Sequence, residues 1–234
     1  MATVAGIDGC RRGWLCVTKD LATGQIDARI LGQLGELLAM KPRPKIVTID
    51  VPIGLTDVGA RVCDLQARKL LKFPRSCSVF PAPIRPVLAA ECYAEACQIG
   101  LRVDGRKINR QTWAIVPKIR EVDACLRGHP SHQRRMREVH PEVCFCAWNS
   151  NKAMGSRKKS MAGRAEREAL VEPRYGNGYR VAQSSLPHGQ YNNDDLLDAF
   201  AALWTAERIA VGVSTVLPTD PPLDSWGLRM EIVV

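Results

Sequence analysis

Short apolar runs and turn residues alternate over the first fifty residues. Val4–Asp8, Trp14–Thr18 and Ile26–Leu31 predict three strands, because each run is rich in strand-forming residues and glycine-bearing turns separate them. Leucines recurring on one face predict a short helix over 34–40, which two prolines end. The continuous apolar run Ile46–Val51 is typical of a strand covered on both sides. Hairpin-linked strands followed by a helix and a buried strand predict a mixed α/β sheet.

The middle and the end of the chain have helical periodicity. We expect helices over Val62–Leu71, Val87–Cys97 and Gln111–Leu126, the last of them interrupted near Pro117. A long helix is expected from Asp194 to about Val211, because a run of acids opens an apolar stretch there.

Strand signals return between and after these helices. Glu138–His140 predicts a short strand, Pro141 breaks it, and Glu142–Trp148 is interpreted as its continuation. A basic, glycine-bearing stretch runs over 151–167, and Arg229–Val233 predicts a last strand. With no internal repeat or clear linker, we interpret residues 1–234 as one domain with a helical and loop insertion over roughly 56–136.

Charge and cysteine content narrow the function classes. The net charge of +9, with a pI near 9.3, favours a polyanionic partner such as DNA or RNA, and simple solubility is the alternative. The nine cysteines form no CxxC pair, and Cys144 and Cys146 alternate as in a strand without a second pair for zinc. With no leader expected before Met1 and no apolar run long enough to span a membrane, we expect a cytoplasmic protein. The sequence leaves open whether the protein forms a homo-oligomer.

Aspartates stand where two strands end and where the long helix begins. Asp8 and Asp50 end strands, and near buried β-branched residues a carboxylate is costly unless a cation compensates its charge. On the helix, Asp198 lies about 60° from Asp195 and about 40° from Asp194 around the axis. N-capping accounts for Asp194 and in part for Asp195, but it accounts poorly for Asp198, which lies deeper. These positions predict a shared metal site.

Carboxylates with few histidine or cysteine ligands suit Mg²⁺ or Mn²⁺ better than zinc. Two such ions ~3.5–4 Å apart can hold a scissile phosphate and activate water, with about four acidic ligands. Glu138 and Glu142 bracket His140 and Pro141, and a glutamate facing the same cleft would supply a further anion. His140 itself is interpreted as structural.

At this point the residues resemble a known family. The order of motifs is similar to the domain-of-unknown-function family 429, whose members are expected to be ribonuclease H-like nucleases. The resemblance extends from Val4 to about Arg208, on the segments GIDGCRRGW, TIDVPIGL, RSCSVFPAP, PKIREVD, EVHPEVCFCAW and DDLLDAFAALW.

The resemblance implies a five-stranded ribonuclease H-like sheet of order 3-2-1-4-5, with helices on both faces. It places Asp8 on the central strand and Asp50 at the end of strand 4. Asp195, Asp198 and Ala199 match the closing helix of Holliday-junction resolvases, where two acids one turn apart precede an alanine. For the remaining glutamate we prefer Glu138 over Glu142. The fold analogy gives no role to the segment 76–78, Ser-Cys-Ser.

The leading hypothesis is a two-metal-ion nuclease that hydrolyses DNA or RNA, with the catalytic and metal-binding residues Asp8, Asp50, Glu138, Asp195 and Asp198. Basic side chains would contact phosphates. They are Arg11, Arg12, Lys118, Lys158 and Lys159.

Two other classes stay open. One is a phosphotransferase or nucleotide-binding protein of the actin-like ATPase type, which uses a glycine turn after strand 1; here Gly9 follows Asp8, but no second such turn is found. The other is a non-catalytic nucleic-acid-binding module on the same scaffold. A fold alone does not decide between these classes.

Overall fold

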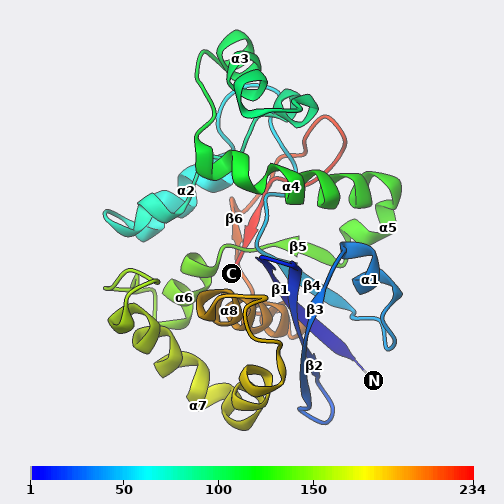
Figure 1. Ribbon diagram of the computed structural model, residues 1–234, viewed down its shortest axis with the longest axis vertical. Helices are drawn as coiled ribbons and strands as arrows, with labels where there is room; N and C mark the ends of the chain where they lie inside the picture. The colour runs from blue at the N-terminus through cyan, green and yellow to red at the C-terminus, as the bar shows by residue number, and fades with distance from the viewer. Residues whose placement is uncertain (1) are drawn as a thin grey trace.

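A five-stranded mixed sheet forms the centre of the computed structural model, which describes residues 2–234 apart from the side chains of Pro130 and Ser131 (Figure 1). The strand order β3-β2-β1-β4-β5 confirms the expected order. The first three strands are antiparallel neighbours, and β4 and β5 are added in parallel to β1. The strands are β1 (Thr3–Cys10), β2 (Gly13–Asp20), β3 (Ile26–Leu31), β4 (Ile46–Ile49) and β5 (Met136–Glu138).

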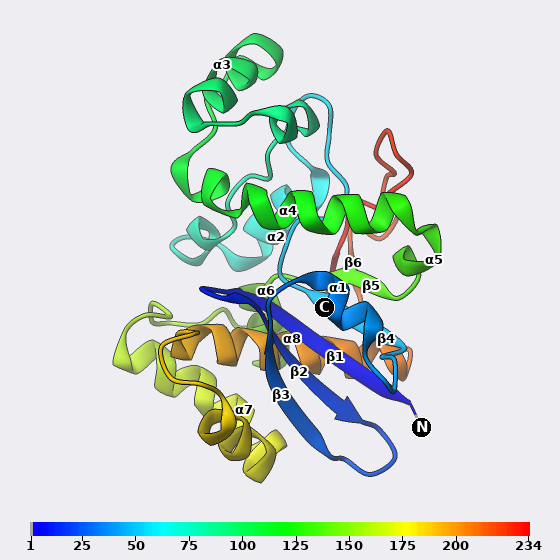
Figure 2. The same cartoon turned by 45° about the vertical axis from the view of Figure 1, so that its right-hand side comes forward.

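Helices cover both faces of this sheet, as expected (Figure 2). One face packs against α6 (Pro141–Trp148), α7 (Met161–Ser185) and α8 (Asn193–Ala210), and the other packs against α1 (Leu34–Ala39) and α4 (Arg110–Gly128). Side chains of β1 alternate between the two cores, with Val4 on the α8 side and Ala5 and Ile7 on the α4 side. By the same alternation, the side chain of Asp8 faces α8.

The backbone of α8 lies directly on the centre of the sheet. A Cβ on Gly6 would lie 2.1 Å from the backbone nitrogen of Leu203 and 2.3 Å from the carbonyl oxygen of Ala199, so only glycine permits this contact. On β4, beside Gly6, the buried Thr48 hydroxyl donates a hydrogen bond to the Ala202 carbonyl at 2.7 Å. These contacts fix the position of α8 on the sheet. Gly6 and Thr48 each lie two residues before an aspartate, Asp8 and Asp50.

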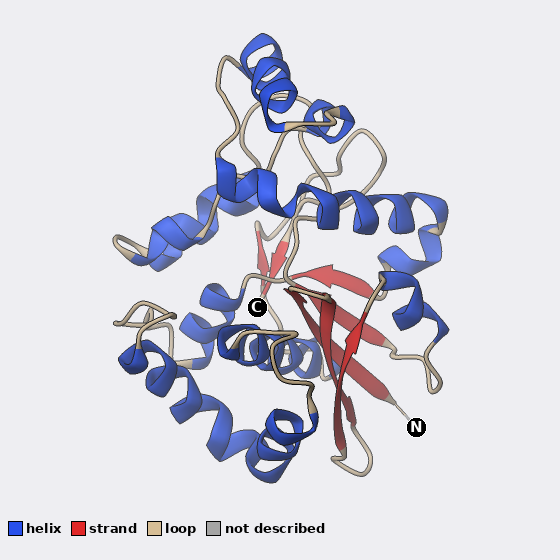
Figure 3. Cartoon of the chain, in the orientation of Figure 1, coloured by secondary structure: helices blue, strands red, loops and turns tan. Residues whose placement is uncertain are grey.

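The long segment between β4 and β5 forms most of the upper part of the molecule in Figure 3. Beside α4 it contains two 3₁₀ turns and three helices, namely η1 (Arg75–Ser78), η2 (Arg85–Ala89), α2 (Val62–Leu71), α3 (Tyr93–Asp104) and α5 (Pro130–Gln133). A separate two-stranded ribbon pairs β6 (Val216–Leu217) with β7 (Ile232–Val233). The expected last strand is thus shorter than Arg229–Val233 and lies outside the main sheet.

Four predictions in the middle of the chain are wrong. Glu142–Trp148 is helix α6 and not a continued strand, because Pro141 fits the first turn of a helix, where no backbone N–H is needed. Cys144 and Cys146 are both buried in this helix and do not alternate across a strand. Pro117 does not interrupt α4, whose apolar residues pack on both sides of it. The helix expected over Val87–Cys97 is divided into η2 and α3.

The sequence pattern does not predict the 25-residue helix α7. This helix contains Pro173 and a kink at Gly176, whose backbone is not helical, so its periodicity is broken in the middle. By contrast, α2 and β3 have the predicted boundaries. Within residues 2–234 no helix is both long enough and apolar enough to cross a membrane.

Replacing Gly6 with alanine tests the contact between β1 and α8. We expect Gly6→Ala to lower the free energy of unfolding by about 2–3 kcal/mol, because helix backbone has to move to admit one methyl group. Chemical denaturation measures this loss. The matched control is Gly35→Ala in α1, where no atom lies within 4 Å of the new Cβ, and its stability should stay equal or rise. Equal stability of both variants would contradict the close contact.

Candidate active site

Asp8 and Asp50 lie side by side at the same edge of the sheet. β1 and β4 are parallel with Ile7 opposite Ile49, and the N–H of Asp50 donates to the Ile7 carbonyl at 3.0 Å. The next residue on each strand is therefore an aspartate, at the strand spacing of about 4.8 Å. The Gly9 N–H donates to Asp8 Oδ1 at 2.8 Å and holds that carboxylate where β1 turns.

Helix α8 adds Asp198 to this pair. Only 1% of Asp198 is exposed and 7% of Asp8, although these are charged side chains. One turn after Asp198, the close contact at Gly6 holds the helix backbone on β1, so both acids face the same small space. The prediction that two strands and the last helix bring their aspartates together agrees with this placement.

Of the two acids before Asp198, Asp195 and not Asp194 takes part in capping α8. Asn192 caps α8, and Asp195 completes the capping box by accepting from the Asn192 N–H at 2.7 Å. Asp194 was interpreted as the cap, yet its carboxylate lies 3.7 Å from the ammonium of Lys158. Capping therefore engages Asp195 and leaves Asp194 at the edge of the cluster.

Burial and the negative charges of neighbouring acids raise the pKa values of Asp8, Asp50 and Asp198. Burial, followed by the charges of Asp50 and Asp198, raises the pKa of Asp8 well above its usual range. Burial raises the pKa of Asp50 to about 6, which His140 partly offsets and Asp198 increases. For Asp198, burial also raises the pKa, against the opposing effect of Lys158. Clustered acids with raised pKa values are typical of functional sites.

Lys158 provides the positive charge that acts on all three acids. Its Nζ donates to Asp198 Oδ2 at 2.7 Å, and the charges of Asp198, Asp8 and Asp50 raise its pKa. It comes from the loop between α6 and α7, part of the basic stretch noted in the sequence. The sequence reading assigned Lys158 to phosphate contacts and did not foresee this ion pair.

Three buried polar atoms around the acids have no hydrogen-bond partner among the described residues. They are Asp198 Oδ1, Glu142 Oε2 and His140 Nδ1. The other nitrogen of His140 donates to the Ser78 carbonyl at 3.3 Å, so a neutral ring leaves Nδ1 as an acceptor. Such atoms are costly when they are buried without a partner. His140, interpreted as structural, is thus a group of the site that the sequence reading missed.

As they stand, no three His, Cys, Asp or Glu side chains in residues 2–234 are arranged so that they could hold a metal ion. The Lys158 ammonium lies among the acids instead. Binding of a divalent ion would therefore need small movements of these side chains.

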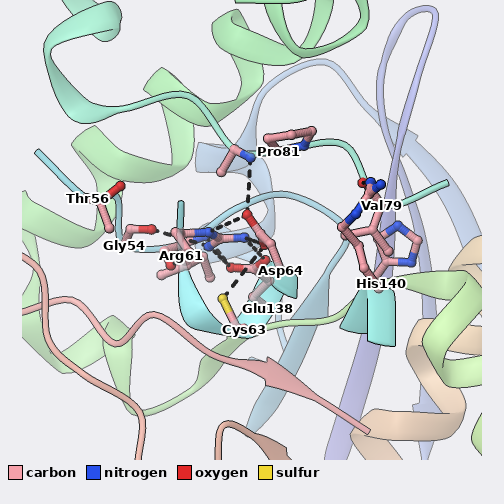
Figure 4. A network of polar contacts seen from close by, with 12 residues as sticks. Gly54, Thr56, Arg61, Cys63, Asp64, Val79, Pro81, Glu138 and His140 are labelled. Atoms are coloured by element: carbon pink, nitrogen blue, oxygen red, sulfur yellow. Dashed lines mark hydrogen bonds and ion pairs between the residues drawn. The ribbon is translucent and has the colours of Figure 1, made fainter. Parts of the chain in front are cut away.

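Glu138 lies in a different cluster, which Figure 4 shows. Both of its carboxylate oxygens accept hydrogen bonds from the guanidinium of Arg61, each at 2.7 Å, and the Ile53 N–H donates to it at 2.6 Å. Asp64 pairs with the same arginine. The side chains of Arg61 and Glu138 are 2% and 4% exposed, so this pair joins α2 to β5 in the interior. Both oxygens of Glu138 are therefore bound within this cluster, apart from Asp8, Asp50 and Asp198.

The geometry therefore favours Glu142 over Glu138, against the preference from the sequence. The charge of Glu142 raises the pKa values of both Asp50 and Asp198. One oxygen of Glu142 accepts from the buried Arg167, and the other is the unpartnered Oε2. Glu142 is in the first turn of α6, directly after Pro141, so the strand predicted over Glu142–Trp148 concealed this position.

Comparison with known proteins adds one finding. The family described as "Protein of unknown function (DUF429)" matches residues 6–223. The chain belongs to this family. No curated protein matches it, and no solved structure matches it. Membership confirms the resemblance seen in the motifs, and the roles of the residues rest on the geometry of this DUF429 chain.

The basic side chains expected to bind phosphate are unevenly placed. Arg11 and Arg12 are exposed in the turn between β1 and β2, three and four residues after Asp8. Lys159 is also exposed. Lys118 differs, because its ammonium contacts the Gly13 carbonyl and lies 4.2 Å from the centre of the Trp14 ring. Lys118 thus fastens α4 to the hairpin and is not free to reach a ligand.

An open hollow of about 550 Å³ borders the acids. Lys158 and Asp194 form its boundary with the cluster, and Lys159, Arg164 and His188 also line it. The first turns of α7 and α8 both reach this hollow. Basic side chains and helix N-termini favour an anion. The hollow is therefore a suitable approach for a negatively charged substrate.

The pKa of Asp50 makes a prediction about stability in the absence of metal. With a pKa of about 6, the folded protein holds this proton to a higher pH than the unfolded chain, whose aspartates have pKa values near 3.9. The stabilising effect of the proton is fully present below about pH 4 and is lost as the pH rises through about 6. Ionised Asp50 thus destabilises the fold at neutral pH.

Asparagine cannot ionise, so we expect Asp50→Asn to raise the free energy of unfolding by ~1–2 kcal/mol at about pH 8 and to change it little at about pH 4. Urea denaturation in EDTA at both pH values measures this. The exposed Asp27, paired with Arg29 on the surface, provides the control Asp27→Asn, which should show no such dependence. A variant of Asp50 that is less stable than wild type at pH 8 would contradict the assignment.

Proposed function

We propose that this DUF429 chain is a nuclease that hydrolyses phosphodiester bonds of DNA or RNA with the help of Mg²⁺ or Mn²⁺. One observation carries the proposal: Asp8, Asp50 and Asp198 come from three separate parts of the chain to one place, where Asp8 and Asp198 are buried, Asp50 is half-buried and their charges are only partly compensated. Such an arrangement costs stability in the protein alone, so a ligand of positive charge is the natural complement.

The residues fit a hard divalent ion. The donors are carboxylate oxygens, which Mg²⁺ and Mn²⁺ prefer. Asp198 Oδ1 and Glu142 Oε2 are buried and have no hydrogen-bond partner in the part of the chain that the structure describes. Asp8, Asp50 and Asp198 would hold the ion, with Glu142 as a further ligand. A divalent ion bound there would lower the pKa of a bound water and offset the charge on a scissile phosphate.

The protein's own groups support a polyanionic substrate. The chain has a net charge of +9, and the hollow beside the acids is lined by Lys159, Arg164 and His188. Exposed Arg11 and Arg12 lie on the turn that follows Asp8. These side chains would hold backbone phosphates on either side of the acids, and His140, beside Asp50, can accept a proton at Nδ1.

Removal of single carboxylates tests the proposal. Asp8→Asn and Asp198→Asn should each lower Mg²⁺-dependent cleavage of DNA or RNA at least ~100-fold, because a lost ligand disturbs both ion and substrate. Asp27→Asn, the same change at an exposed site, should cleave like wild type. Circular dichroism verifies the fold of each variant. Cleavage that survives both substitutions would refute the assignment. Salt-sensitive nucleic-acid binding by a wild type without turnover would instead support the binding module.

The two glutamates make a second test. We expect Glu142→Gln to weaken Mn²⁺ binding by roughly 10–100-fold, since Glu142 has an unpartnered oxygen beside the aspartates. Glu138→Gln should leave Mn²⁺ affinity unchanged but cost about 3 kcal/mol of stability, because it breaks a buried pair with Arg61. Calorimetric titration and denaturation separate the two effects. The reverse pattern would restore Glu138 as the ligand.

A further inference from the structure

The number of available carboxylates limits how many divalent ions the site can hold. Five acids were expected as ligands, and about four are needed for two ions. Glu138 is fully paired with Arg61, and Asp195 is engaged in the capping box of α8. Asp8, Asp50 and Asp198 remain, together with one oxygen of Glu142, because Arg167 donates to the other. Three carboxylates and one further oxygen match one divalent ion better than two.

A fixed positive charge is already among these acids. Lys158 Nζ donates to Asp198 Oδ2 at 2.7 Å and lies 3.7 Å from Asp194. Asp198 is 1% exposed and the Lys158 side chain is 39% exposed, so this ion pair lies at the edge of the buried acids. Asp8 and Asp50 are close enough for their charges to act on the same ammonium.

The loop before Lys158 is held on both sides. The Ser156 N–H and hydroxyl donate to the carboxylate of Glu166 at 3.0 and 2.9 Å. Arg75, from η1, donates to the Ser156 carbonyl at 3.0 Å. Met154, two residues earlier, is buried in the core. These contacts come from three separate parts of the chain, so the loop has a defined path towards the acids.

The loop after Lys158 is fixed as well. The Ser160 N–H and hydroxyl both donate to the Arg157 carbonyl, at 2.9 and 2.7 Å, where α7 begins. A Cβ on Gly163 would lie 1.9 Å from that carbonyl oxygen, so the first turn of α7 packs directly on it. The backbone on either side thus presents Lys158 to the cluster. Although the Lys158 side chain is 39% exposed, its ammonium pairs with the buried Asp198 and its backbone is held on both sides.

We propose that the Lys158 ammonium occupies one of the two cation positions of the site, so that the protein binds one divalent ion and Lys158 supplies the other positive charge. This rests on the proposed function for the divalent ion. The role of Lys158 is then to neutralise Asp198 and to present a cation beside the scissile phosphate. It replaces the two-ion arrangement expected from the sequence.

The test counts bound Mn²⁺ in the full chain by equilibrium dialysis and electron paramagnetic resonance. Lys158→Met removes the ammonium at similar length, and we expect it to bind one more Mn²⁺ per chain than wild type. The wild type should give the spectrum of an isolated ion, whereas the variant should show exchange coupling between two ions ~4 Å apart. The matched controls are Lys159→Met, an exposed neighbour with the same charge change, and Lys158→Arg, and both should bind as wild type.

If Lys158→Met does not fold, Lys158→Met/Asp194→Asn removes one neighbouring negative charge and keeps the three aspartates. Mn²⁺ should raise the melting temperature of the lysine variant more than that of wild type, because the ion replaces the lost charge. An equal Mn²⁺ count in wild type and variant, or two ions in wild type, would overturn the role of Lys158. A wild type that binds no Mn²⁺ would overturn the proposed function instead, and a gain of one ion in the variant would still support the position of Lys158.

Discussion

The contact of helix α8 with the middle of β1 is the constraint on which the rest of the site depends. Gly6 allows the backbone around Ala199 and Leu203 to lie on the strand, and Thr48 hydrogen-bonds to the same helix from β4. Because side chains alternate along a strand, Gly6 and Asp8 share the face that α8 covers. Gly6, which contacts the helix backbone, is thus two positions before the charged Asp8. The same contact brings Asp198 of α8 close to Asp8.

The close approach of α8 buries charged carboxylates, and these acids differ in how fully neighbouring cations compensate their charges. Arg61 fully pairs Glu138, and Arg167 takes one oxygen of Glu142, so these acids have internal partners. The charges of Asp8, Asp50 and Asp198 are opposed by Lys158, by His140 near Asp50 and by Lys118 near Asp8, and burial still raises all three pKa values. The difference separates a structural ion pair, which is complete, from a cluster whose pKa values stay raised and which is the proposed site of a further cation.

The sequence predicted the sheet well because strand signals are local. Its order follows the family resemblance, and Asp8, Asp50 and Asp198 were found from their places at the ends of elements. The errors have physical causes as well. Pro141 can break a strand or open a helix, and the wrong choice hid Glu142 in the first turn of α6. Glu138 and Lys158 are defined by partners 77 and 40 residues away, which no local pattern reveals.

The central claim is that three aspartates from two strands and one helix form a divalent-cation site. Crystals of the wild-type protein soaked in Mn²⁺ and measured at the manganese absorption edge test it most directly. The account predicts an anomalous peak within ligand distance, about 2.0–2.3 Å, of oxygens from Asp8, Asp50 and Asp198. Anomalous density only at other places, or none at a saturating concentration, would contradict it.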